Sequence, residues 1–368
     1  EIVAGERHTC VTNHLGEIRC MGYNGGSSKM VLGNSSTTET NSSTLVLVDI
    51  GFGTDLVRSV TTGYDTSCAI LENSTQAVCW GQRETWVDTE GNTRSGELLL
   101  GSSNASNTGT VVDLGNPGDR IYSITMGESH ACAIVENTIE CWGVEESGSF
   151  GYGNTNNGTS FATPRVTSVP NGLRAMQIVI EHSTDSTCGV FEDTNGELSV
   201  ICWGDETTVG YSGTSENVVS LNNLPVQDGN GDSISLSDSS QSPYDIVDIQ
   251  SGVHHTCAMS RQGLIKCWGR NNAKQLGFDA TNLNIGDHPE EMGINLQYID
   301  LGPNVTATQM AVGSQQNCVV VQSSVDSSMN GKVMCWGYNS QRQINSTSNA
   351  YISPSITSQF GNDVVKLA

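Results

Sequence analysis

The chain has 368 residues, 36% of them hydrophobic, and its 39 acidic and 16 basic side chains give a formal net charge of −23. Such a charge repels nucleic-acid phosphates and anionic membranes, so nucleic acid is excluded as a partner class. No stretch approaches the roughly 18 apolar residues of a membrane span, so we expect no membrane insertion. The chain opens at Glu1 without a Met or an apolar leader. We therefore expect that a secretory signal was removed or never included.

Twelve cysteines form six pairs that recur along the whole chain. The second members of successive pairs are 59, 62, 61, 65 and 68 residues apart. This regular spacing predicts six repeats within a single domain, 1–368. We expect the repeats at 1–57, 58–120, 121–176, 177–245, 246–307 and 308–368. The pairs are Cys10 and Cys20, Cys68 and Cys79, Cys132 and Cys141, Cys188 and Cys202, Cys257 and Cys267, and Cys318 and Cys335.

Two further signals accompany the cysteine pairs. A glycine stands five residues before the first cysteine in five repeats, as Gly5, Gly63, Gly127, Gly252 and Gly313. A Trp-Gly follows the second cysteine in five repeats, at Trp80, Trp142, Trp203, Trp268 and Trp336, and Met21 replaces the tryptophan in the first repeat. Five of the six tryptophans occupy this one position, so we expect each indole to fill an equivalent packing site.

The fifth repeat shows the strand pattern most clearly. Residues 245–252 alternate in polarity, residues 255–260 are apolar, and 264–268 return after a turn, which predicts a strand followed by a β-hairpin. Each cysteine pair is symmetric about its turn, and opposed residues of a hairpin lie close enough for a disulfide. Reduced thiols and zinc ligands are weaker interpretations, because the short chelating steps of zinc sites are missing. We predict six disulfides and an oxidising, extracellular location.

Each repeat ends in a Gly-, Asn- and Ser-rich connection and then a proline-led stretch typical of an edge strand, such as that at Pro164. About four strands per repeat predict an all-β propeller of six four-stranded antiparallel blades. Residues 363–368 resemble 245–250, and residues 1–5 resemble 248–252. We therefore expect strands from the two termini to close the ring.

Residues 252–277 have the pattern Gly-x-x-His-Thr-Cys-Ala, then Ile-x-Cys-Trp-Gly-x-Asn, then Gln-Leu-Gly. This pattern resembles the repeat of the regulator of chromosome condensation family. The resemblance implies a propeller that usually has seven blades, so seven blades remain the alternative to six. Partial matches to Gln-Leu-Gly occur at Leu32-Gly33 and Leu100-Gly101. The founding member promotes nucleotide exchange on a small nuclear GTPase and binds chromatin, which an acidic, disulfide-bonded chain does not suit. Protein binding is what the resemblance implies across the family, which includes an inhibitor of β-lactamase.

We expect no catalytic residue in this chain. His8, His130 and His255 stand two residues before a cysteine, a placement that invites a nucleophile-and-base interpretation. Their recurrence in separate repeats favours structural imidazoles, and a disulfide-bonded cysteine is no nucleophile. No cofactor is expected apart from a candidate calcium loop at Asp228, Asn230 and Asp232, with Asp238 as a closing ligand. The spacing of these residues departs from that of a calcium loop. Asp88, Glu90 and Asn92 form a second, weaker candidate calcium loop.

Seven Asn-x-Ser/Thr sequons are candidate glycosylation sites. Their number matches chance for this composition, but all fall in expected turns or connections. They are at Asn34, Asn41, Asn73, Asn104, Asn157, Asn304 and Asn345.

The composition and the repeats together favour a non-enzymatic extracellular propeller that acts through its surface. An acidic, disulfide-bonded exterior rich in Ser, Thr, Asn and Gly suits a structural scaffold or a subunit of an extracellular assembly or filament that contacts other proteins or itself. The alternative is a recognition or adhesion module for protein or glycan, or an inhibitor-like propeller. The two differ in mass: a subunit forms large species or filaments, whereas a module stays near 39 kDa until its partner is added.

Overall fold

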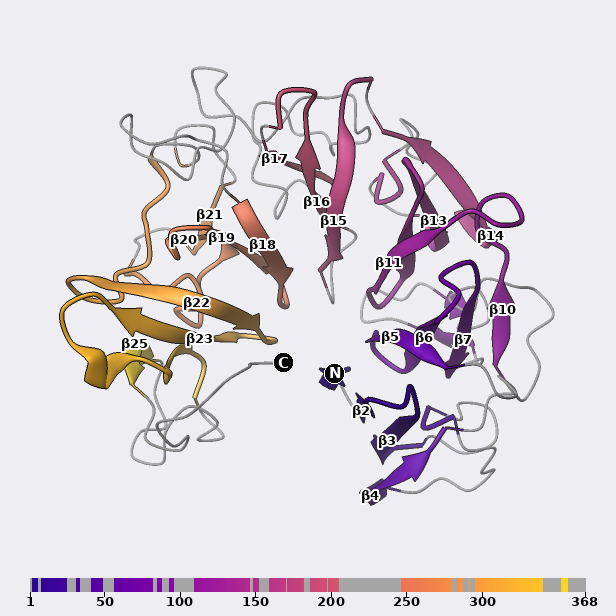
Figure 1. Cartoon of the computed structure of the whole chain (residues 1–368), viewed down its shortest axis with the longest axis horizontal. Helices are drawn as coiled ribbons and strands as arrows, with labels where there is room; N and C mark the ends of the chain where they lie inside the picture. The colour runs from indigo at the N-terminus through magenta and orange to yellow at the C-terminus, as the bar shows by residue number, and fades with distance from the viewer. Residues whose placement is uncertain are drawn as a thin grey trace. The chain divides into compact units, whose positions relative to one another are not determined.

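A computed structural model gives the fold of most of the chain (Figure 1). It describes residues 2–5, 8–24, 31–33, 41–48, 56–81, 85–87, 93–95, 109–145, 148–151, 159–169, 171–181, 186–196, 198–204, 246–279, 283–286, 291, 295–339 and 352–356. These residues divide between two compact units. Unit 1 contains the described residues up to 169, and unit 2 contains those from 171 onward.

Unit 1 contains three antiparallel sheets, which we number blades 1 to 3. Blade 1 consists of β1 (Ile2–Ala4), β2 (His8–Thr12), β3 (Ile18–Tyr23) and β4 (Asn41–Leu47), paired in chain order. Blade 2 consists of β5 (Val57–Thr62), β6 (Thr66–Leu71), β7 (Ala77–Gly81) and β10 (Thr110–Val112), and the hairpin of β8 (Thr85–Val87) and β9 (Thr93–Ser95) lies between its last two strands in sequence. Blade 3 consists of β11 (Ile121–Met126), β12 (His130–Val135), β13 (Thr138–Glu145) and β14 (Thr159–Ser168).

Unit 2 contains blades 4 to 6. Blade 4 has three described strands, β15 (Arg174–Ile180), β16 (Ser186–Glu192) and β17 (Leu198–Gly204). Blade 5 consists of β18 (Ile246–Ser251), β19 (His255–Ser260), β20 (Ile265–Arg270) and β21 (Asn284–Ile285). Blade 6 consists of β22 (Val305–Val312), β23 (Gln316–Ser323), β24 (Lys332–Gly337) and β25 (Ile352–Ile356), and a 3-10 turn, η3 (Ser327–Met329), joins β23 to β24.

These sheets confirm the predicted fold class, an all-β propeller with antiparallel blades, and the described residues form six blades. Five blades show four strands among the described residues, and the segment that follows β17, 205–245, lies outside them. Strand β1 pairs with β2 from the same end of the chain. Residues 357–368, which the expected ring closure requires, lie outside the described part, so closure stays a prediction.

Six disulfides join the two central strands of the blades. In every blade the two cysteines are directly opposed in the register of the second and third strands. Their Cα atoms lie 4.0 to 4.1 Å apart, the close spacing of neighbours across an antiparallel pair. The pairs are those expected from the sequence, and all twelve cysteines are buried.

The tryptophan after the second cysteine is buried in all five blades that carry it. Trp336 Nε1 donates a hydrogen bond of 3.0 Å to the carbonyl of Gln275, in the Gln-Leu-Gly turn of the preceding blade. A side chain on Gly277 would lie 2.7 Å from Ile299 and 3.1 Å from Trp336 Nε1, and one on Gly33 would lie 2.9 Å from Trp80 Nε1. Leu32-Gly33 therefore packs against the tryptophan of the next blade in the same way as Gln275 to Gly277 does.

The same turn occurs in blade 3, where the sequence pattern did not reveal it. Phe150 is fully buried, and Gly151 has a φ of 75°, close to the 77° of Gly277. The amide of Gly151 donates to Gly148 O, as that of Gly277 donates to Lys274 O. Phe150 thus fills the place of Leu276. The partial match at Leu100-Gly101 lies outside the described residues.

Candidate functional site

A β-bulge at one end of the first strand recurs in five blades. The register shifts between 57 and 59 in β5, 121 and 123 in β11, 175 and 177 in β15, 246 and 248 in β18, and 307 and 309 in β22. A bulge inserts one residue without a partner and re-aims its side chain. The inserted residues are Arg58, Tyr122, Met176, Val247 and Thr308. We call this end of each blade, together with the turn between its second and third strands, the bulge edge.

Exposed apolar side chains gather at the bulge edge of both units. In unit 1 these are Leu15, Leu56 and Tyr122, which are 54%, 49% and 46% exposed. In unit 2 they are Met176, Val247, Leu264 and Val325. They make up seven of the fourteen large hydrophobic residues that are exposed in the described part of the chain. Within each unit, exposed apolar groups at one end of the blades are typical of a binding site.

Within unit 1 the bulge edge contains a cleft between blades 1 and 2. It measures about 300 Å³ and is lined by residues 12–16, 56–58 and Glu72. Backbone hydrogen bonds fix its walls, from Val57 N to Gly16 O at 3.2 Å and from Glu72 N to Leu56 O at 2.7 Å. The lining includes apolar Leu15 and Leu56 together with Glu72 and Arg58.

The cation of Arg58 holds the neighbouring bulge in place. Its Nη2 donates to Ile121 O at 2.7 Å and to Tyr122 O at 3.0 Å. The guanidinium of Arg120 lies 5.3 Å from the centre of the Tyr122 ring, within the range of a cation–π contact. Tyr122 is thus exposed but oriented, and arginine and tyrosine are enriched at the core of protein interfaces.

In unit 2, two glutamine side chains bind the backbone of the first strand of the next blade, beyond its bulge. The side-chain amide of Gln177 donates to Ile249 O at 2.8 Å and accepts from Ile249 N at 3.2 Å, as a neighbouring strand would. Gln250 does the same with the next blade, donating to Met310 O at 2.9 Å and accepting from Val312 N at 3.1 Å. Asp248 accepts a hydrogen bond from each of the two glutamines, and burial raises the pKa of its carboxyl.

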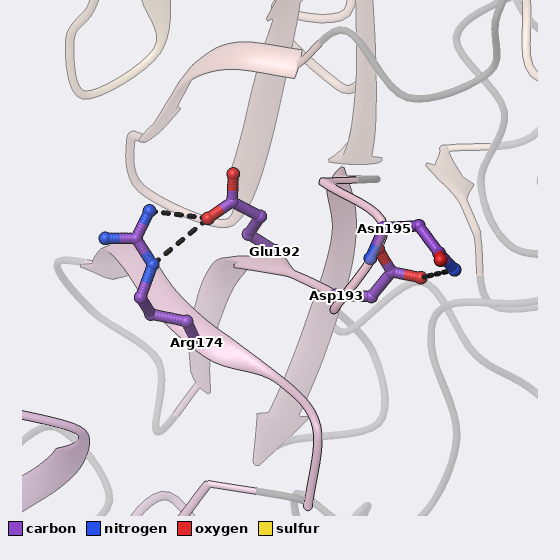
Figure 2. Close-up of polar contacts among 4 residues, drawn as sticks. All are labelled: Arg174, Glu192, Asp193 and Asn195. Atoms are coloured by element: carbon purple, nitrogen blue, oxygen red, sulfur yellow. Dashed lines mark hydrogen bonds and ion pairs between the residues drawn. The ribbon is translucent and has the colours of Figure 1, made fainter.

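A charged pair lies at the bulge edge of blade 4 (Figure 2). Arg174, the first residue of β15, contacts Glu192, the last residue of β16, through two nitrogens on one carboxylate oxygen. In the following turn Asp193 Oδ1 accepts from the backbone amide of Asn195 at 2.8 Å, and its Oδ2 accepts from the Asn195 side chain at 3.1 Å. The turn is therefore ordered by its own side chains, and the Arg174 cation remains exposed to solvent.

The three histidines before the cysteines are buried, in agreement with the structural interpretation. His8 Nε2 lies 2.7 Å from Ser67 Oγ of the next blade, and His255 Nε2 lies 2.9 Å from Asn317 Oδ1. The Asn317 amide nitrogen donates to Gln275 O, so its oxygen faces His255, whose Nε2 must carry the hydrogen. Burial lowers the pKa of His8 to about 4 and that of His130 to about 3, and it lowers the pKa of His255 as well. These imidazoles are neutral, and those of His8 and His255 link neighbouring blades.

A buried carboxylate replaces glycine in blade 4. Glu181 N donates to Ser186 O, as Gly252 N donates to His255 O in blade 5. Glu181 is 1% exposed, and its Oε1 accepts a hydrogen bond of 3.0 Å from Thr256 Oγ1. At the matching place in blade 2, a side chain on Gly63 would lie 2.8 Å from Gly127 O, which explains the small residue there.

The remaining candidate sites are only partly covered by the described residues. Asn73 and Asn304 lie in exposed turns, and Asn41 lies in β4. The sequons at Asn34, Asn104, Asn157 and Asn345 lie outside the described part, as do the calcium candidates Asp228, Asn230 and Asp232 with Asp238, and Asp88, Glu90 and Asn92. Among the described residues, no three metal-binding side chains converge, and no helix has the length and apolarity of a membrane span.

The bulge edge itself did not emerge from the sequence pattern, although a signal was present. Buried residues in the first strands are three apart, as in Val57 and Val60, or Ile121 and Ile124. An unbroken strand places residues of one face two apart, so a spacing of three marks an inserted residue.

Comparison with known proteins identifies the repeat. A family model described as the regulator of chromosome condensation (RCC1) repeat matches residues 246–275. The ultraviolet-B receptor UVR8 of Arabidopsis thaliana is 23% identical over 228 residues, which cover 60% of this chain and 42% of the receptor. The E3 ubiquitin-protein ligase HERC2 of Homo sapiens is 24% identical over 227 residues, 61% of this chain and 4% of the ligase. The matched region thus spans less than half the length of either relative.

Solved structures agree on the fold. Prp20p of Saccharomyces cerevisiae, studied with its binding to Gsp1p and histones, has a TM-score of 0.69 at 18% identity, covering 97% of this chain and 76% of Prp20p. Human WBSCR16 has a TM-score of 0.64 at 12% identity, covering 98% of this chain and 83% of WBSCR16. At such identities the likeness concerns the fold alone. Together with the repeat match, it confirms the resemblance seen in the sequence.

Proposed function

We propose that this propeller with RCC1-type repeats is a secreted, non-enzymatic protein that acts as a scaffold or subunit of an extracellular assembly, through contacts made at its bulge edge. The observation that carries the proposal is the pairing of all twelve cysteines, one disulfide across the centre of every blade. Disulfides of this kind persist in oxidising compartments and are rare where thiols are kept reduced.

The bulge edge supports the choice of contact surface. It offers apolar and aromatic groups whose backbone is fixed by Arg58 in unit 1 and by Gln177 and Gln250 in unit 2. Side chains that are already oriented lose little conformational entropy on binding, which favours association. A chain that carries −23 charges repels its own copies, so contacts must concentrate where apolar groups and arginines offset that repulsion.

A second candidate, a recognition module that stays monomeric until its partner arrives, is favoured by the composition of the cleft in unit 1. Leu15, Leu56 and Arg58 line the cleft, and Tyr122 lies at the same edge in blade 3. Arginine and tyrosine are among the residue types that dominate hot spots, so this edge suits a single partner segment. An inhibitor-like propeller is a special case of this candidate. The two functions use the same surface and differ in the oligomeric state of the isolated protein.

The test is the mass of the full chain after secretion from an oxidising compartment, measured by light scattering and negative-stain imaging. A scaffold subunit forms species well above the 39.1 kDa of one chain, and Leu56→Asp with Tyr122→Asp disperses them. Val111→Asp, at a 59% exposed residue on outer strand β10, is the matched control and leaves them intact. If the wild type is a monomer, and its mass is the same in the Val111 variant and in the bulge-edge variants, the result favours the recognition module. Reactive thiols in the native protein overturn both functions.

A further inference from the structure

We propose that Asn73 and Asn304 carry N-linked glycans in the secreted protein. The inference rests on the secretion that the proposed function requires, and it adds a covalent modification at two defined atoms, the Nδ2 nitrogens of these side chains. The choice rests on the surroundings of the three sequons in the described part of the chain, because a motif that occurs as often as chance allows carries no weight by itself.

Asn73 lies in the turn between β6 and β7 of blade 2, in the sequon Asn73-Ser74-Thr75. Its side chain is exposed, and its Oδ1 accepts a hydrogen bond of 3.0 Å from the backbone amide of Thr75. This contact fixes the carbonyl end of the amide against the turn. The nitrogen end has no partner among the described residues, so a sugar attached there disturbs no contact of the fold.

Asn304 lies in the turn before β22 of blade 6, in the sequon Asn304-Val305-Thr306. Its φ of 60° is left-handed, a conformation that asparagine tolerates better than most residues. The backbone is held by hydrogen bonds from Val305 N to Gly302 O and from Ser324 N to Asn304 O, both 3.3 Å. The side chain is exposed, so this turn also accommodates a bulky substituent.

Asn41 differs from these two. It lies in strand β4, opposite Tyr23, and its backbone belongs to the ladder of blade 1. Turns tolerate bulky additions better than paired strands do, because their backbone need not align with a neighbour. Of the three sequons in the described part of the chain, we therefore assign glycans to the two in turns.

The chemistry is a transfer to nitrogen. The co-reactant is a lipid diphosphate-linked oligosaccharide of the secretory pathway, with its transferase. The asparagine Nδ2 forms a bond to the anomeric carbon, the bond between that carbon and the diphosphate oxygen breaks, the lipid diphosphate leaves, and one Nδ2 proton passes to a base of the transferase. No oxidation or reduction is involved.

Both sites lie at the bulge edge of their blades. Asn73 follows Glu72, which lines the cleft of unit 1. A glycan on Asn73 therefore stands beside the cleft and narrows the directions from which a partner segment reaches Leu56 and Arg58. Removing it is expected to increase access to that cleft.

The experiment uses the full chain secreted from eukaryotic cells, treated with a glycan-removing amidase in heavy-oxygen water and analysed by peptide mass spectrometry. We expect heavy-labelled aspartate at 73 and 304. Thr75→Ala and Thr306→Ala each abolish one label while leaving the asparagine in place, and the matched variants Thr75→Ser and Thr306→Ser retain it.

A secreted chain with six intact disulfides and unlabelled asparagine at 73 and 304 overturns the inference but not the proposed function. If just one of the two positions carries the label, the assignment of a glycan to the other position is overturned. A chain that remains in the cell with reduced cysteines overturns both proposals.

Discussion

The two units have blades of the same design but join neighbouring blades with different polar groups. Both units use a buried histidine to join neighbouring blades, through His8–Ser67 in unit 1 and His255–Asn317 in unit 2. The first strands are joined differently: unit 1 uses the cation of Arg58 on two carbonyls, and unit 2 uses the side-chain amides of Gln177 and Gln250. The interior of a blade and its histidine contact are thus repeated, whereas the polar contacts between first strands differ between the units. Substitutions inside a blade should therefore cost the same in both units, and substitutions at junctions should not.

The largest expected effect tests the tryptophan position. Trp336 is fully buried and bonded to Gln275, whereas Met21, at the same register position in blade 1, is 38% exposed. Trp336→Ala should lower the free energy of unfolding by about 3–5 kcal/mol. Met21→Ala should cost less than about 1 kcal/mol. Guanidinium unfolding followed by tryptophan fluorescence measures both. An equal loss would show that Met21 is packed as tightly as the indoles.

The disulfides should show no difference between the units. Cys257 and Cys267 close a loop of sequence separation 10, and Cys68 and Cys79 close one of 11. Because the stabilisation depends on loop length, replacing either pair by alanines should cost about 2–3 kcal/mol. The measurement is the unfolding midpoint of the two double variants under oxidising conditions. A gap larger than about 1 kcal/mol between them would contradict the view that blade interiors are equivalent.

Acid should weaken unit 1 through His8 and His130 and unit 2 through His255. Burial lowers the pKa of His8 from 6.5 to about 4. Below pH 6.5, His8 is therefore protonated in the unfolded chain but neutral in the folded chain. Stability is full above pH 6.5 and falls by about 1.4 kcal/mol per pH unit for each such histidine until the folded pKa is reached. Glu140 in unit 1 and Asp248 in unit 2, whose pKa values burial raises, act in the opposite direction near their own pKa values.

The check is the pH slope of unfolding between pH 7 and 5, with His8→Gln as the comparison. Glutamine keeps a polar group opposite Ser67 but takes up no proton, so its slope should be shallower by about one proton. Identical slopes for the wild type and His8→Gln would mean that His8 is already protonated in the fold.

Much of the blade interior followed from the sequence. Cysteines symmetric about a turn predicted opposed positions, and the repeated Trp-Gly predicted a common packing site, because both signals act within one hairpin. The strand number, the disulfides and the structural histidines depend on such local patterns. Trp336 illustrates the limit, since its hydrogen-bond partner Gln275 belongs to the preceding blade and no local pattern names it.

The candidate site was not predictable in the same way. Tyr122 and Met176 look like ordinary members of alternating strands, and only the shift in pairing to the neighbouring strand reveals that they are inserted and exposed. Glu181 likewise occupies the place of a glycine, but it stands seven residues before Cys188 instead of five, so the spacing in the sequence does not reveal the match. Register and loop length are properties of pairs of segments, so composition and spacing in one segment leave them undetermined.

The smallest expected effect separates the two arginines at the bulge edge. The Arg174 side chain is 57% exposed and pairs with a single carboxylate, so Arg174→Ala should cost about 0.5 kcal/mol or less. Arg58 is half-buried, and its loss leaves the carbonyls of Ile121 and Tyr122 without a donor, so Arg58→Ala should cost about 1–3 kcal/mol. Unfolding at low and high salt distinguishes them, because screening removes only the exposed pair. If Arg174→Ala lowered the free energy of unfolding as much as Arg58→Ala at high salt, the Arg174–Glu192 pair would also act as a junction between blades. Unit 2 would then join its blades through an arginine as unit 1 does.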